Sequence, residues 1–406
     1  MKGKLKGKLI ISIILLAVLV LPLFATACEP VEPVPTLKIG CLEWFGFPLG
    51  IDCVNELDAI VPVFNAAGGL VINGQQYNIE MIIEDSGMDP PTALAAVEKL
   101  IYQDEVDFII SDETTDWWLD TTEENEVLVV ACSPSPVLLD PAYEYVFQAS
   151  SLHTNPPSVF GWFVENHCSG NETFAAMFSD DLKGHAEAAM LENLCATFNV
   201  TLLDIQFYNP AETEFSSYAE ALVALDPDVY TTCAGGPVQD SLSMKAMRDA
   251  GFEGQILLYV ALSLEQIEMV LGDLSAVEGM IAVAVATELD PPTAVAQELM
   301  DAYIAEHGEW TYPVILHINA WYCLMEALDQ AQSLVPADVA AVIADGMAFE
   351  TPQAPAVMIS RPDFGNNRTV DALFEAYMIQ VVGGEAVLID TISLAEALEK
   401  VQMTFP

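Results

Sequence analysis

Residues 61–111 are VPVFNAAGGLVINGQQYNIEMIIEDSGMDPPTALAAVEKLIYQDEVDFIIS, in which two apolar runs flank a helical pattern. The runs cover residues 79–83 and 106–110, and residues 90–103 between them place apolar side chains three and four positions apart. Short, mainly apolar runs predict buried strands, and the three-to-four spacing predicts an amphipathic helix. Strand, helix and strand in this order indicate two parallel strands joined by a helical crossover.

The same alternation extends in both directions from this unit. Further apolar runs lie at residues 37–41 and 127–131, and residues 293–345 are again helical in pattern. In the second half, predicted strands cover 174–178, 202–208, 228–233, 256–260 and 279–286, with helices over 184–197, 214–225 and 240–250. Two such series predict an α/β fold of two doubly wound, Rossmann-like lobes. The later helical segment predicts that the chain returns to the first lobe.

Ligands of doubly wound sheets bind beyond the carboxyl ends of the strands, where loops lead into helices. This rule directs attention to six loops, at residues 42–50, 111–118, 132–140, 179–184, 234–240 and 261–264.

The composition is strongly acidic, with 12 Lys and Arg against 60 Asp and Glu and a formal net charge of −48. Four of the basic residues are within the first eight positions. Binding of nucleic acid requires clustered Lys and Arg to contact phosphates. The composition therefore excludes nucleic acid as a partner and predicts an anionic surface.

The N-terminus resembles the signal segment of a bacterial lipoprotein. Residues 1–8 carry four lysines, and residues 9–27 carry no charge. Ala25-Thr26-Ala27-Cys28 resembles the lipoprotein box, with alanine where leucine is usual at the first position. We expect a signal peptide over 1–27, lipidation of Cys28, and an extracytoplasmic protein attached to the membrane. The proline-rich residues 28–36 predict a stiff tether. An uncleaved anchor and simple secretion stay open as alternatives.

Motifs of common enzymes and cofactor sites are absent from the sequence. There is no GxSxG, HExxH, P-loop or GxGxxG pattern, and no CxxC pair. The five histidines, at 153, 167, 185, 307 and 317, show no metal-ligand spacing. We therefore predict no catalytic residue, no metal and no cofactor, and we interpret His317 as an ordinary packed or exposed residue.

The segment 61–111 resembles the first lobe of type I periplasmic binding proteins of the leucine/isoleucine/valine-binding kind. The resemblance is carried by four pieces: Asn65-Ala66-Ala67-Gly68-Gly69, Asn73-Gly74, Glu84-Asp85 and Asp89-Pro90. Residues 143–150, 226–236, 244–258 and 271–284 continue the family's order and spacing, so that the resemblance covers about residues 37–390.

The resemblance implies a monomeric, non-catalytic solute receptor of an ABC importer, whose two lobes close on a small ligand and are then recognised by the permease. The lobes are joined by three crossings in this family. We place lobe 1 at 37–149 and 289–365, and lobe 2 at 150–288 and 366–406. A sensor of the same fold stays open, as does an extracytoplasmic hydrolase, for which His185 is the histidine nearest a cleft loop.

On lobe 1 the resemblance assigns hydroxyl groups to the ligand carboxylate and aromatic rings to the pocket wall. The hydroxyl candidates are Thr114, Thr115, Ser133 and Ser135, and the aromatic candidates are Trp44 and Phe45. For the two threonines, capping of the following helix is the alternative role.

On lobe 2 the resemblance places Lys183, Gly235, Gly236 and Ala261 at the ligand. Lys183 is positioned to pair with a carboxylate, or else is an ordinary surface lysine beside Asp180. Ala261 stands where amino-acid binders carry the carboxylate that holds the ligand's ammonium group. The hypothesis is therefore a carboxylate-bearing aromatic or aliphatic ligand in place of an α-amino acid.

Overall fold

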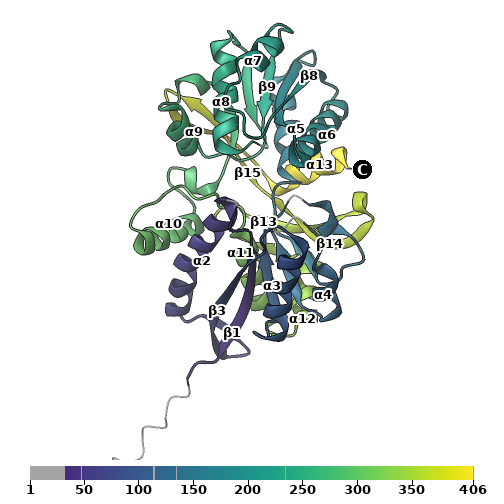
Figure 1. The fold of residues 1–406 in the computed structure, drawn as a ribbon, viewed down its shortest axis with the longest axis vertical. Helices are drawn as coiled ribbons and strands as arrows, with labels where there is room; N and C mark the ends of the chain where they lie inside the picture. Colours follow the sequence, from purple (N-terminus) through teal and green to yellow (C-terminus); the bar gives the residue numbers. More distant parts are fainter. Residues whose placement is uncertain (1–32, 47, 113–114, 134, 234, 406) are drawn as a thin grey trace, which may run out of the picture. The chain divides into compact units, whose positions relative to one another are not determined.

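The computed structural model describes residues 33–46, 48–112, 115–133, 135–233 and 235–405 (Figure 1). The predicted signal peptide, Cys28 and Thr114 lie outside these residues. No helix in the described part of the chain is long and apolar enough to cross a membrane.

The first sheet has nine strands in the order β12-β13-β14-β6-β5-β4-β1-β3-β2. Its parallel centre, from β1 through β4 and β5 to β6, is flanked by antiparallel strand pairs. The strands are β1 (Thr36–Glu43), β2 (Leu70–Ile72), β3 (Gln75–Asp85), β4 (Phe108–Ser111), β5 (Leu128–Ala131), β6 (Val146–Gln148), β12 (Ala348–Phe349), β13 (Ala356–Arg361) and β14 (Asn366–Phe374).

Helices pack on both faces of this sheet and thereby bury its central strands on both sides. In β4, Phe108 and Ile110 face one apolar cluster and Ile109 faces another, which is the alternation of a doubly covered sheet. The helices are α2 (Pro48–Ala66), α3 (Pro90–Tyr102), α4 (Leu119–Glu124), η2 (Pro136–Leu139), α10 (Ala294–His307), α11 (Asn319–Ala331), α12 (Pro336–Ala344) and η5 (Pro362–Phe364). The predicted helical return to the first lobe is therefore confirmed.

The second sheet has seven strands in the order β16-β15-β11-β10-β9-β7-β8. Strands β7 to β11 are parallel, and β15 and β16 add an antiparallel edge. The strands are β7 (Thr173–Ser179), β8 (Thr201–Tyr208), β9 (Val229–Thr232), β10 (Gln255–Leu258), β11 (Ile281–Ala284), β15 (Ala376–Val382) and β16 (Glu385–Ile392). Its helices are α5 (Asn155–His167), α6 (Leu182–Thr197), α7 (Ser216–Val223), α8 (Gly236–Asp249), α9 (Leu264–Leu271), η3 (Ser275–Val277), η4 (Ala286–Glu288) and α13 (Leu394–Thr404).

The chain crosses between the two sheets three times, after β6, after β11 and after β14. The three crossings and the two-lobed α/β class agree with the expectation. The last crossing differs in position, because β14 pairs with β13 and β6 in the first sheet and the chain leaves that sheet only at residue 375. Residues 366–374 therefore lie with the first sheet, whereas the expected boundary was at 365. Both sheets are mixed and not purely parallel, since the strands after residue 345 are mostly antiparallel to their neighbours.

The motif Asn65-Ala66-Ala67-Gly68-Gly69 has a local structural cause. Asn65, at the end of α2, donates from Nδ2 to the carbonyl of Ile79 at 2.9 Å and accepts from the Ile79 amide at 2.7 Å. Gly69 has φ +61°, and a Cβ there would lie 2.2 Å from the Tyr77 carbonyl oxygen. The side-chain amide and the glycine together fix how α2 connects to β3.

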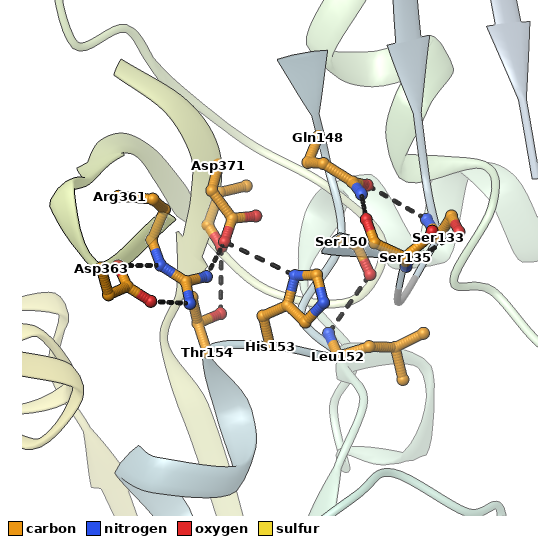
Figure 2. A network of polar contacts seen from close by, with 11 residues as sticks. Ser133, Ser135, Gln148, Ser150, Leu152, His153, Thr154, Arg361, Asp363 and Asp371 are labelled. Atoms are coloured by element: carbon orange, nitrogen blue, oxygen red, sulfur yellow. Dashed lines mark hydrogen bonds and ion pairs between the residues drawn. The ribbon is translucent and has the colours of Figure 1, made fainter. Parts of the chain in front are cut away.

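A buried ion-pair network joins the first crossing to β13 and β14 (Figure 2). Arg361, 1% exposed, donates to both oxygens of Asp363 at 3.0 and 2.7 Å and also pairs with Asp371, which is 0% exposed. Asp371 stands opposite Gln148 in the β14–β6 register, and His153 Nδ1 lies 3.7 Å from its carboxylate. The network therefore fixes β13, β14 and the start of the first crossing relative to one another.

Arg361→Met is expected to lower the free energy of unfolding by about 3–5 kcal/mol, because it leaves the Asp371 carboxylate buried without its cation. Urea unfolding measures this loss. Lys245→Met is the matched control, since Lys245 pairs with Asp249 on the surface of α8 and contributes at most about 0.5 kcal/mol. Equal losses in the two variants would contradict the role given to Arg361.

Candidate functional site

A cavity of about 240 Å³ lies where strands of both sheets end. Its first-sheet side consists of Trp44, Met88, Asp112 and residues 313–317, and these follow β1, β3 and β4 or precede α11. Its second-sheet side is formed by residues at the carboxyl ends of β9, β10 and β11 and at the starts of α5, α6, α8 and α9. The cavity is thus at the position where doubly wound sheets bind ligands.

Four of the residues predicted for the site line this cavity: Trp44, Lys183, Gly236 and Ala261. Gly235 is next to the lining and donates its amide to Asp240 at 3.3 Å. The lining found among the described residues does not include Phe45, which is 41% exposed, or Thr115. Thr114 is outside the described residues.

Ser133 and Ser135 are buried in the wall of the first sheet (Figure 2). The Ser133 amide donates to Gln148 Oε1 at 3.2 Å, and Gln148 Nε2 donates to the Ser135 carbonyl at 3.1 Å. Ser133 Oγ accepts from the Ser135 amide at 3.2 Å. These contacts hold the loop after β5 against β6, and neither serine is part of the cavity lining.

Lys183 shares the second-sheet wall with two carboxylates that the sequence did not single out, Glu187 and Asp240. Glu187 is four residues after Lys183 on α6, so both side chains lie on one helix face. Burial raises the pKa of Asp240 to about 6, although Thr232 donates to it at 2.9 Å and the charge of Lys183 favours its ionised form. Burial also raises the pKa of Glu187. The i, i+4 spacing of Lys183 and Glu187 was the sequence signal for this pair.

Glu288 brings a carboxylate to the wall that contains Ala261. It comes from η4, after β11, and accepts the Leu264 amide at 2.8 Å and the Val285 amide at 3.4 Å. Burial, followed by the charge of Glu265, raises its pKa to about 8. Sequence reasoning considered only the loop after β10 and missed this residue. An acidic group is therefore present at this wall of the cavity, although Ala261 does not supply it.

The first-sheet wall contains Asp112 and His317, and the buried Glu43 lies next to them outside the lining; the three residues are 8%, 5% and 1% exposed. His317 Nδ1 lies 3.8 Å from Glu43 Oε2 and 3.6 Å from Asp112 Oδ2. Burial, together with the neighbouring Cys53 and Asp112, raises the pKa of Glu43 well above its usual range. His317 is therefore packed among acids at the cavity, and not an incidental helix residue. His185, by contrast, contacts the exposed Asp180 at 2.9 Å outside the lining.

A sequence model of a family described as periplasmic binding protein matches residues 44–385 of the chain. The chain belongs to the periplasmic binding protein family. Members of this family bind solutes and are not catalysts, so the resemblance seen in the sequence is confirmed and the hydrolase alternative is excluded. A search of curated proteins finds no sequence match.

Solved structures share the fold of this binding protein at low sequence identity. A solute-binding protein of an ABC transporter from R. palustris, in complex with benzoate, has a TM-score of 0.65 and 16% identity, covering 88% of this chain and 96% of the other. A leucine-binding protein from Thermotoga maritima has a TM-score of 0.64 and 17% identity, covering 88% and 98%. An ABC transporter substrate-binding protein from Sphaerobacter thermophilus has a TM-score of 0.70 and 17% identity, covering 88% and 98%.

The raised pKa of Asp240 makes the stability of the binding protein depend on pH. An ordinary Asp has a pKa of about 3.9, so the folded protein retains this proton between about pH 4 and pH 6 while the unfolded chain has lost it. The resulting stabilisation is complete below pH 4 and is lost as the pH rises through 6. Asp240→Asn removes this dependence.

Urea unfolding at several pH values tests the effect. Between about pH 4 and pH 7, the stability of Asp240→Asn relative to the natural protein is expected to increase by about 2–3 kcal/mol. Asp249→Asn, an exposed position on the same helix, is the control and is expected to follow the natural protein at every pH. If the free energy of unfolding changes with pH in the same way for Asp240→Asn and for the natural protein, the role given to Asp240 is contradicted.

Proposed function

We propose that this binding protein is the extracytoplasmic solute receptor of an ABC importer and that it carries its solute in the cavity between the two sheets. The observation that carries the proposal is the cavity itself. Residues that follow strands of both sheets line it, and both sheets belong to one compact part of the chain that starts at Leu37. A solute held from both sides favours the closed arrangement of the lobes, which gives a permease a state to recognise. The structural relatives from R. palustris and Sphaerobacter thermophilus are binding proteins of ABC transporters, which supports the same role.

The lining favours a small solute with a charged end and an apolar body. Trp44, Leu152, Val260 and Leu316 supply apolar surface, and Lys183 is the one lysine or arginine of the described lining. We infer that Lys183 pairs with a carboxylate of the solute. Glu288 lies on the same wall as Ala261 and accommodates an ammonium group where one is present, so that carboxylates and amino acids both fit this arrangement.

Membrane attachment through Cys28 is part of the same proposal. Residues 25–28 carry the lipoprotein-like box, and residues 29–35, EPVEPVP, provide a spacer before β1 begins at Thr36. Expression in a bacterium that processes lipoproteins tests this point. Cys28→Ala is expected to move the protein from the membrane fraction to the soluble fraction, and an unchanged distribution would contradict lipidation at this residue.

Thermal unfolding of residues 29–406 against a solute panel tests the proposed receptor. The panel contains branched and aromatic amino acids, aromatic carboxylates, dicarboxylates, short amides and urea. A solute at a hundred times its dissociation constant is expected to add about 2.7 kcal/mol to the free energy of unfolding. If no solute of the panel stabilises the protein against thermal unfolding, the proposed ligand class is contradicted.

Two variants test whether a solute that stabilises the protein, called a hit below, binds in the cavity. Lys183→Met is expected to weaken a carboxylate hit by about 10-fold or more, because a charge-assisted hydrogen bond is lost. Trp44→Ala is expected to weaken every hit, whereas Trp117→Ala, which is 37% exposed and outside the lining, is expected to have no effect. Calorimetric titration of the hit measures all three affinities. Equal weakening by both tryptophan variants would place the solute elsewhere.

A further inference from the structure

We propose that Glu43, Asp112 and His317 bind a divalent transition-metal ion at the first-sheet wall of the cavity. This inference does not depend on the transport role, since metal binding is a property of the isolated chain. It is also separate from Lys183, which lies on the second-sheet wall.

The topology brings the three residues together from distant parts of the sequence. Glu43 is the last residue of β1, and Asp112 directly follows β4, which is the parallel neighbour of β1. His317 arrives from the segment before α11, after the chain has returned from the second sheet. Since β1 and β4 end at the same edge, their two carboxylates meet the imidazole at one point.

The distances between the polar atoms suit a single metal ion. His317 Nδ1 is 3.8 Å from Glu43 Oε2 and 3.6 Å from Asp112 Oδ2, and donor atoms of all three residues lie within 4.8 Å of one another. Metal–oxygen and metal–nitrogen bonds of about 2.0–2.2 Å separate neighbouring donors by about 3–4 Å. The three donors therefore require only small side-chain movements to bind one ion.

The Glu43 carboxylate is the independent observation that points to a ligand. It is 1% exposed, and its Oε1 accepts a long contact of 3.6 Å from the Cys41 thiol. Its Oε2, the atom nearest His317, has no hydrogen-bond partner within the part of the chain that the structure describes. A buried carboxylate oxygen without a donor is costly, and a cation between it and the imidazole removes that cost.

The donor set selects the class of metal. Mg²⁺ and Ca²⁺ prefer oxygen donors only, whereas one imidazole with two carboxylates suits zinc, manganese or iron. Three protein donors leave further coordination positions open. Asp112 and His317 line the cavity, so water or a solute oxygen on the cavity side completes the coordination.

Calorimetric titration of metal-free mature protein with ZnCl₂ and MnCl₂ tests the site, with MgCl₂ for comparison. We expect one zinc or manganese ion per chain and at least 10-fold weaker binding of magnesium. Manganese is included because cysteine thiols bind it poorly, so that its binding is not attributable to the buried cysteines. Absence of zinc and manganese binding, or several weak equivalent sites, would overturn the proposal.

Paired variants assign the ion to these residues. Asp112→Asn and His317→Gln are each expected to weaken binding at least 10-fold, with folding checked by thermal unfolding without metal. His185→Gln and Asp180→Asn are matched controls, because they alter an exposed His–Asp pair with a 2.9 Å contact and are expected to leave the affinity unchanged. Weaker metal binding in the control variants, or unchanged metal binding in the site variants, would overturn the assignment.

A measurement on the natural protein covers the case in which the site variants do not fold. In crystals soaked with ZnCl₂, the anomalous signal of zinc is expected between Glu43, Asp112 and His317. A zinc peak elsewhere, or none, would overturn the proposal. The solute panel is a separate measurement on the metal-free protein, so failure of the metal site and failure of the receptor role are distinguishable.

Discussion

Parallel strands present all their carboxyl ends at one edge of a sheet, and the cavity of this protein depends on that constraint in both sheets. β1 and β4 are followed by Trp44 and Asp112 on one wall, and β9, β10 and β11 lead into the loops that bear Asp240, Ala261 and Glu288 on the other. The helices that cover both faces of each sheet keep those edges in place. The chemistry of the cavity is therefore set by which residues happen to follow the strands.

The two walls carry different kinds of charge. The second-sheet wall has Lys183 among carboxylates whose pKa values are raised by burial, to about 6 for Asp240 and to about 8 for Glu288. The first-sheet wall has His317 within 4 Å of two buried carboxylates. A chain with 60 acidic residues thus places several of them in a cavity with a largely apolar lining, where each must find a proton, a cation or a polar solute.

Most of the fold follows from local patterns in the sequence, and the missing part has a clear physical cause. The central strands of both sheets are buried and consist mainly of apolar residues, so apolar runs such as 106–110 and 174–178 locate them well. The antiparallel additions after residue 345 escaped prediction, because β16 (Glu385–Ile392) is exposed over nearly all of its length and exists through its pairing with β15. Its apolar residues carry no alternation that a single sequence reveals.

The sequence predicted where the site lies better than it predicted which ionisable side chains the site contains. The rule that ligands bind beyond strand ends located the loops that contain Trp44, Lys183 and Ala261. It did not rank the carboxylates, because acids are too abundant in this chain for any one to be singled out. His317 was missed for a different reason, since its place at the cavity depends on the return of the chain from the second sheet.

A crystal structure of the binding protein with the tightest solute of the panel tests the central claim most directly. The account predicts electron density for the solute in the cavity, in contact with residues from both sheets, including Lys183 on one side and Trp44 or Asp112 on the other. A solute bound on the outer surface, or held by one sheet alone with the other wall unengaged, would contradict it.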